Sequence, residues 1–126
     1  MKTTRIALTV LMMLAITTTA LAKNAPPTKQ TFKQEMRLQI RLIKKGAVEK
    51  MRVRFIERLR PRITRENLQD AVEEIGKYTI DDLVDHVKLG ERDGRPTAKV
   101  MMKNGRKLTT FVLVDGHWLA SSLWFK

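Results

Sequence analysis

The apolar residues of this chain change their spacing near Gly90, and this change limits the folds that the chain can form. Before Gly90, apolar residues recur every three or four positions, as on the buried face of a helix. Beyond it, stretches rich in Val, Leu, Phe, Trp and Thr are divided by Asn104-Gly105 and Asp115-Gly116. Such dipeptides accept the positive φ angles of two-residue hairpin turns. The sequence therefore predicts an α+β fold, with N-terminal helices packed on a C-terminal three-stranded antiparallel meander.

Four helices are expected before the sheet, and the first two lie in its most basic part. Thr31, with Gln34 three residues later, has the pattern of a capping box and starts the first helix. A strand-like alternation competes with this helix and is formed by Met36, Leu38, Ile40 and Leu42. The cap and the long charged side chains favour the helix. The second helix is expected over residues 47–59 and ends before Pro61.

The third and fourth helices have clearer boundaries. Thr64 caps the third, which ends at Gly76, and Thr79 caps the fourth, which ends before Gly90. Each has apolar residues at helical spacing. These are Leu68, Ala71, Val72 and Ile75 in the third helix, and Ile80, Leu83, Val84 and Val87 in the fourth.

Three strands are expected over residues 96–103, 106–114 and 117–125. Two-residue turns would pair Lys103 with Arg106 and Val114 with His117. Counting back from the turns places three residues side by side on one face: Ala98, Phe111 and Ala120.

Both faces of this meander carry apolar residues. The face of Phe111 also holds Val100, Met102, Leu113, Trp118 and Trp124. The opposite face holds Met101, Leu108, Val112, Leu119, Leu123 and Phe125, together with Lys99, Lys103 and Arg106. A sheet with one face in water alternates more cleanly than this. We therefore expect the sheet to curl around a cavity, or its second face to be covered by a partner such as a second copy in a homodimer.

Residues 1–22 have the pattern of a cleavable secretory signal. Lys2 and Arg5 supply the positive charge, residues 6–16 form an apolar core, and Ala20 and Ala22 are the small residues of the cleavage site. This core is shorter than the ~20 residues that span a bilayer, so no transmembrane anchor is expected after cleavage. The mature chain is expected to be exported, either to a periplasm or out of the cell.

The mature chain is long enough for one small domain. Residues 23–30 read as a linker and residues 31–126 as a single α+β domain. The sequence contains no cysteine, which excludes a lipoprotein anchor, a disulfide, a cysteine nucleophile and a thiolate metal site. The product is therefore expected to be soluble. No metal is expected, because the acidic residues lack the loop spacing of an EF-hand, and no cofactor is expected.

The positive charge is unevenly distributed. The formal net charge is +12. Residues 23–65 carry fourteen Lys or Arg and three Glu, residues 66–93 carry nine acidic and three basic residues, and residues 94–126 carry six basic and one acidic. This excess favours an anionic partner, although a solvated face partly neutralised by the acidic block is the alternative. Export disfavours nucleic acid, which leaves lipid or another envelope polyanion. The candidates for anion binding share one helical face and are Lys33, Arg37, Arg41, Lys44 and Lys45.

The C-terminal hairpin resembles that of a known family. A strand, the Asp115-Gly116 turn and a final strand bearing Trp118 are similar to the last hairpin of the nuclear-transport-factor-two-like superfamily, which has a cystatin-like α+β fold. The resemblance implies that the helices pack in the concave face of a curved sheet and form a cone. Members of the superfamily include isomerases, dehydratases and hydrolases as well as noncatalytic binding and dimerisation domains. The enzymes keep acids or an Asp–His pair inside the cone, whereas the expected sheet has no inward acid.

Two groups of residues are candidates for a site. Met102, Phe111, Trp118 and Trp124 could line an apolar ligand pocket, although plain core is the alternative. Asp85 and His86 would point roughly 100° apart on a helix, which argues against a catalytic dyad. The expected function is therefore noncatalytic binding of a small apolar or anionic envelope ligand or a partner protein. The alternatives are an enzyme of the same superfamily, using His86 or His117, and a polyanion- or membrane-surface-binding protein.

Overall fold

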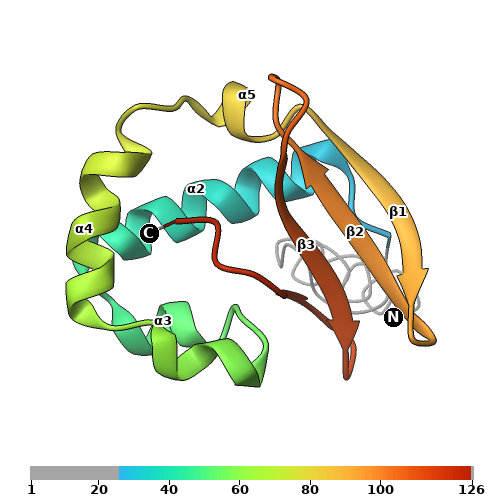
Figure 1. Cartoon of the computed structure of the whole chain (residues 1–126), viewed down its shortest axis with the longest axis horizontal. Coiled ribbons are helices and arrows are strands. Elements are labelled where there is room, and N and C mark those ends of the chain that lie inside the picture. Colours follow the sequence, from blue (N-terminus) through green and yellow to red (C-terminus); the bar gives the residue numbers. More distant parts are fainter. Residues whose placement is uncertain (1–25, 126) are drawn as a thin grey trace, which may run out of the picture.

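The computed structural model describes residues 26–125 (Figure 1). The predicted signal, residues 1–22, lies outside this range. The helices come first and are α2 (Lys29–Lys45), α3 (Val48–Arg52), the 3₁₀ helix η1 (Glu57–Arg62), α4 (Arg65–Ile75) and α5 (Ile80–Leu83). The strands follow and are β1 (His86–Arg92), β2 (Arg95–Met101), β3 (Lys107–Val114) and β4 (His117–Ala120). The α+β class and the order of helices before strands are confirmed.

The sheet has four antiparallel strands in the order β1-β2-β3-β4, whereas we predicted three. The additional strand β1 occupies the second half of the predicted fourth helix. Thr79 does cap a helix, because its hydroxyl accepts a hydrogen bond from the Asp82 backbone N–H, but α5 ends at Leu83. Val87 instead pairs with Val100 of β2. Strand pairing and burial therefore outweigh the helical spacing of the apolar residues here.

The predicted register is confirmed over most of β2, β3 and β4. Phe111 pairs with Ala98 on one side and with Ala120 on the other, as expected. Val114 pairs with His117 across a turn in which Asp115 and Gly116 both have positive φ. This hairpin therefore has the backbone that the Asp-Gly dipeptide predicts.

The predicted pairing is wrong at the turn between β2 and β3. A β-bulge between Val100 and Met101 shifts the register by one residue, so that Met101 pairs with Lys107. The backbone N–H of Met102 then donates to the carbonyl of Arg106 at 2.8 Å. The turn is longer than two residues, and Lys103 does not face Arg106 as a strand partner. A bulge adds one residue to one strand of a pair, which hydrophobic alternation alone does not reveal.

Strand β4 ends at Ala120, five residues before the predicted end at Phe125. Its outer edge is joined to the segment between α3 and η1 by a parallel bridge between Phe55 and Ala120. The backbone N–H of Ile56 donates to the carbonyl of Ala120, and the N–H of Ala120 donates to the carbonyl of Arg54, both at 3.0 Å. A segment far away in the sequence thus closes this edge of the sheet.

The first helix is confirmed over the competing strand, but it starts earlier than predicted. Thr28 is the N-cap, and Thr31 is the third helical residue of the same capping box. The Thr28 hydroxyl accepts from the Thr31 N–H at 3.2 Å, and the Thr31 hydroxyl accepts from the Thr28 N–H at 2.8 Å. Lys29 and Gln30, which we expected in the linker, therefore belong to α2.

The predicted second helix is broken, whereas the third is confirmed. Instead of one helix over residues 47–59, the chain forms α3 and η1, and Pro61 lies inside η1. Helix α4 starts after Thr64, whose hydroxyl accepts from the Asn67 N–H, and it ends before Gly76. The cap and the apolar spacing of α4 are local signals, and no long-range contact overrides them.

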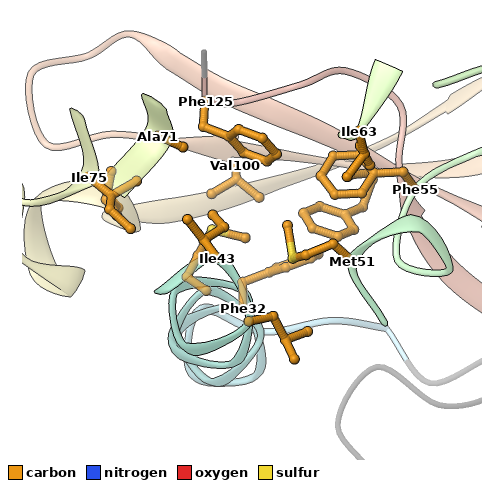
Figure 2. Close-up of a cluster of buried hydrophobic side chains, with 14 of the residues drawn as sticks. Phe32, Ile43, Met51, Phe55, Ile63, Ala71, Ile75, Val100 and Phe125 are labelled. Carbon is orange, nitrogen blue, oxygen red and sulfur yellow. The ribbon is translucent and has the colours of Figure 1, made fainter. Parts of the chain in front are cut away.

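The core lies between the helices and one face of the sheet. Figure 2 shows side chains from α2, α3, α4, β2 and the C-terminal segment converging on one cluster. The rings of Phe32 and Phe111 lie 4.6 Å apart, centre to centre, and those of Phe55 and Phe125 lie 6.0 Å apart. Phe125 is therefore part of the core although it follows the last strand.

Candidate binding site

The structure separates the four residues that were predicted to line an apolar pocket. Phe111 is fully buried and Trp118 is 5% exposed, so both belong to the core. Met102 and Trp124 instead line a cavity of about 230 Å³ between the C-terminal end of α4 and the β2–β3 turn. The lining is completed by Glu74, Ile75, Tyr78, Leu83, Asn104, Arg106, Lys107 and Leu108.

The indole of Trp124 is held in this cavity wall by a chain of hydrogen bonds. Its Nε1–H donates to Oε1 of Gln39 at 2.6 Å. The Gln39 Nε2 donates to Oε2 of Glu35 at 2.7 Å. Arg54 donates to both carboxylate oxygens of Glu35, with a distance of 2.5 Å from Nε to Oε2. The polar end of the indole is thus fixed, and its apolar rings remain available to the cavity.

This network is buried although it contains two charged groups. Glu35 is 1% exposed, Gln39 is fully buried, and the Arg54 side chain is 25% exposed. A carboxylate at this depth is tolerated only when it is paired and its remaining acceptor sites are occupied. Among residues 26–125 no buried side-chain nitrogen or oxygen lacks a hydrogen-bond partner. The network therefore joins α2, the segment after α3 and the C-terminal segment, and each of its buried polar side chains has a hydrogen-bond partner.

Sequence reasoning missed this network, although part of it was visible. Glu35 and Gln39 stand four positions apart, which places them on one face of a helix. Both fall on the side that also carries Phe32 and Met36, so two polar residues on the buried stripe were a detectable signal. Their partner Trp124 lies 85 positions away in the sequence, and no local pattern connects it to Gln39.

The cavity beside Trp124 combines an apolar part with a polar rim. Ile75, Leu83 and Leu108 add to the apolar surface of Met102 and Trp124. Arg106 and Lys107 are exposed at the rim and form no ion pair within residues 26–125. Pockets for drug-sized ligands usually measure about 300–1,000 Å³, and this cavity of about 230 Å³ lies below that range. Its size and lining suit a small molecule with an apolar body and an anionic end.

The structure also divides the five predicted anion-binding residues. Lys33 is 16% exposed and pairs with Asp81 at 2.5 Å, so its charge is already matched. This hydrogen bond and the positive charge of Lys33 lower the pKa of Asp81. The remaining four are exposed on α2 and form no ion pair with any carboxylate in the described range: Arg37, Arg41, Lys44 and Lys45.

Asp85 and His86 contradict the geometry that we expected for them. His86 is the first residue of β1, and its Nδ1 lies 2.8 Å from Oδ2 of Asp85. The two side chains are therefore hydrogen-bonded, because they do not lie on a helix. This bond lowers the pKa of Asp85. The side chains are 44% and 47% exposed, and neither lines the cavity beside Trp124.

A second, larger cavity lies between η1, α4 and the C-terminal segment. Its volume is about 620 Å³, and Arg58, Arg62, Asn67 and Asp70 provide polar lining. The two serines in its wall are already engaged. The Ser121 hydroxyl donates to the Thr110 carbonyl at 2.7 Å, and the Ser122 hydroxyl lies 2.8 Å from the Thr109 hydroxyl. No sequence pattern predicts this cavity, because it depends on the turn of the chain after Ala120.

Within residues 26–125, no three side chains from His, Asp and Glu gather as the ligands of a metal would. None of the helices in this range has the length and apolar character needed to cross a bilayer. Comparisons of the chain with protein-family models, with curated proteins and with solved structures found no match.

Proposed function

We propose that the protein is an exported, noncatalytic binding domain that takes a small ligand with an apolar body and an anionic end. The ligand occupies the cavity beside Trp124. One observation carries this proposal: the indole of Trp124 is fixed by Gln39 in an apolar wall of the cavity. On the rim of the same cavity lie Arg106 and Lys107, two cations that form no ion pair within the described part of the chain. The apolar wall would hold the ligand body, and the rim would hold its charge.

The proposed arrangement is the cystatin-like cone of the nuclear-transport-factor-two-like superfamily, with α2 against the concave face of the sheet. The contact between Phe32 of α2 and Phe111 of β3 supports it. Because Phe111 and Trp118 fill the interior, the ligand would enter at the rim of the cone beside Met102 instead of at its centre.

Two fluorescent probes test the site, because they differ only in one sulfonate group. 1-Anilinonaphthalene-8-sulfonate has an apolar body and an anionic end, and N-phenyl-1-naphthylamine lacks the sulfonate. We expect the folded protein to bind the sulfonate more tightly. The variant R106Q/K107Q should bind the sulfonate about three- to tenfold more weakly, as expected for two exposed ion pairs, and the neutral probe as before.

The control is K50Q/R65Q, which removes the same charge at two exposed positions outside the cavity. It should bind both probes like the parent protein. Near-ultraviolet circular dichroism shows that each variant keeps its packed core. The proposal is rejected if the folded parent binds neither probe, or if both double variants lose sulfonate binding equally.

Export is tested separately from ligand binding. Expression of residues 1–126 in a bacterial host, followed by mass spectrometry of the secreted or periplasmic fraction, should give a protein that begins at Lys23. A protein that stays in the cell with residues 1–22 attached would contradict export. The proposed binding site would still be tested independently by the two probes.

A second candidate function is an enzyme of the same superfamily, and the hydrogen bond between Asp85 and His86 favours it. A carboxylate that orients an imidazole is a common arrangement for a general base. The two half-exposed side chains lack the enclosed surroundings that most such sites have. The purified protein would be tested against 4-nitrophenyl esters. Turnover that H86Q abolishes and H117Q retains would favour the enzyme.

A further inference from the structure

The first two strands place like charges directly opposite each other. In the register of β1 and β2, Lys88 pairs with Lys99 and Arg92 pairs with Arg95. All four residues are exposed. Side chains of directly opposed residues start about 5 Å apart, and like charges in this position destabilise a sheet. The chain therefore carries two unfavourable pairs on one hairpin.

These four cations share the face of the sheet that points away from the core. The alternation of each strand fixes this, because Ala98 and Val100 are fully buried on the other face. Glu91 alternates with the cations and lies on the core side of β1. No outward position in the four strands carries a carboxylate, and the nearby Asp93 and Asp115 lie in the hairpin turns. Nothing acidic on this face offsets its charge.

The neighbouring part of the same face is apolar. The register aligns Thr97 with Val112, and Val112 with Leu119, in one row across β2, β3 and β4. All three side chains are partly exposed. Figure 1 shows the described helices gathered on the opposite side of the sheet, where Phe32 of α2 meets Phe111. We define this surface as the outer face: Lys88, Arg92, Arg95, Lys99, Thr97, Val112 and Leu119.

We propose that the outer face binds an anionic lipid surface. Lys88, Lys99 and the two arginines would contact the headgroups, and the row of Val112 and Leu119 would lie against the boundary with the acyl chains. The cations and the apolar row of the outer face would then each contact a part of the bilayer of suitable chemistry. An acidic protein would match the cations without using the apolar row. A second copy of the chain would bring the same cations together, so it is the less favoured occupant.

Vesicles of phosphatidylglycerol and phosphatidylcholine in equal amounts test this proposal by co-sedimentation. The parent protein should bind them, should bind less at higher salt, and should bind pure phosphatidylcholine only weakly. Each cation near an anionic bilayer changes the affinity about fivefold. The variant K88Q/K99Q should therefore bind the mixed vesicles about 25-fold more weakly.

The matched control is K50Q/R65Q, which removes the same charge from exposed positions of α3 and α4. It should retain most of the vesicle binding of the parent protein. K88Q/K99Q should also remain folded, with a urea midpoint equal to that of the parent or higher, because it removes a pair of opposed like charges. This readout separates lost binding from lost structure.

Four results would overturn the proposal. The first is a parent protein that does not bind the mixed vesicles, and the second is an equal loss of binding in the two double variants. The third is tighter binding to polyglutamate than to vesicles, which would assign the face to an acidic protein. The fourth is a parent dimer in light scattering that K88Q/K99Q strengthens, which would assign it to a second copy. None of these variants changes a residue that lines the cavity beside Trp124.

Discussion

The indole N–H of Trp124 donates a hydrogen bond to the buried amide oxygen of Gln39, with a distance of 2.6 Å between the two atoms. The bond fastens the C-terminal segment to α2, across 85 positions of sequence. Because Gln39 also donates to the buried carboxylate of Glu35, losing the Trp124 bond would disturb the hydrogen bonding of that carboxylate.

Replacing Trp124 with Phe should lower the free energy of unfolding by about 1–3 kcal/mol, because it leaves the buried Gln39 oxygen without a donor. Urea unfolding of W124F, Q39L and the double variant gives the coupling between the two side chains. We expect about 1 kcal/mol. The same cycle with the distant exposed residue Lys50, as K50Q, should be additive. A coupling near zero between Trp124 and Gln39 would contradict the bond.

Replacing Arg54 with Met should destabilise the protein by about 3–5 kcal/mol, because the carboxylate of Glu35 would remain buried without its partner. The double variant E35Q/R54M should recover part of this loss, since the unpaired charge is removed. K77M, which breaks the exposed pair with Glu74, serves as the control and should cost about 1 kcal/mol or below. Equal losses in R54M and K77M would be inconsistent with a buried pair.

The hairpin between β1 and β2 should be sensitive at Gly94, which has a φ of +77°. Alanine there has free space around its Cβ but must adopt a left-handed backbone, which costs about 1–2 kcal/mol. Gly76 provides the matched control because its φ is −64° and an added Cβ would meet only ordinary contacts. G76A should therefore be neutral or stabilising, by about 0.4–1 kcal/mol. If residues 86–89 were helical, as the sequence predicted, the hairpin of β1 and β2 would not form and G94A would have no such cost.

The ion pair between Lys33 and Asp81 predicts a pH effect. Lys33 lowers the pKa of Asp81 below its ordinary value of 3.8. A carboxylate with a lowered pKa stabilises the fold at pH values above 3.8, and this contribution is lost as the pH falls below that value. K33M should raise the pKa of Asp81 in an NMR titration, whereas K50M should not change it. An unchanged pKa in K33M would show that the pair does not form in solution.

The parts of the fold that the sequence predicted correctly depend on local signals. Thr64 and Gly76 delimit α4, and its apolar residues have no competing partner. The Asp115-Gly116 turn determines the register of β3 and β4 for the same reason. In these elements the backbone preference and the burial of side chains agree.

The errors arise where a distant partner decides the structure. Val87 has helical spacing from Leu83 and Val84, but the same residue also fits the buried face of a strand opposite Val100. Strand β1 has low intrinsic preference for a sheet, since it contains Lys88 and Gly90, and it takes its structure from pairing with β2. The Asp93-Gly94 turn was a signal of the same kind as the two that we used, and it was overlooked.

The candidate site was predictable only in part. Met102 and Trp124 were identified as pocket residues and do line a cavity. Phe111 and Trp118 share their expected face of the sheet but are covered by α2 and its neighbours. The alternation of apolar residues in a strand does not show whether helices pack on its apolar face or leave a cavity there. The bond between Asp85 and His86 was not expected, because the predicted helix continued through both residues, whereas α5 ends at Leu83.

The dependence of the core on Trp124 and Phe125 has a consequence for how the protein is made. Phe125 is buried against Phe55, and Trp124 completes the polar chain that begins at Arg54. A growing polypeptide therefore lacks these contacts until residues 124 and 125 have left the ribosome. We expect a nascent chain that exposes only residues 26–120 to remain open to proteases, and the complete fold to form once residues 124 and 125 have emerged.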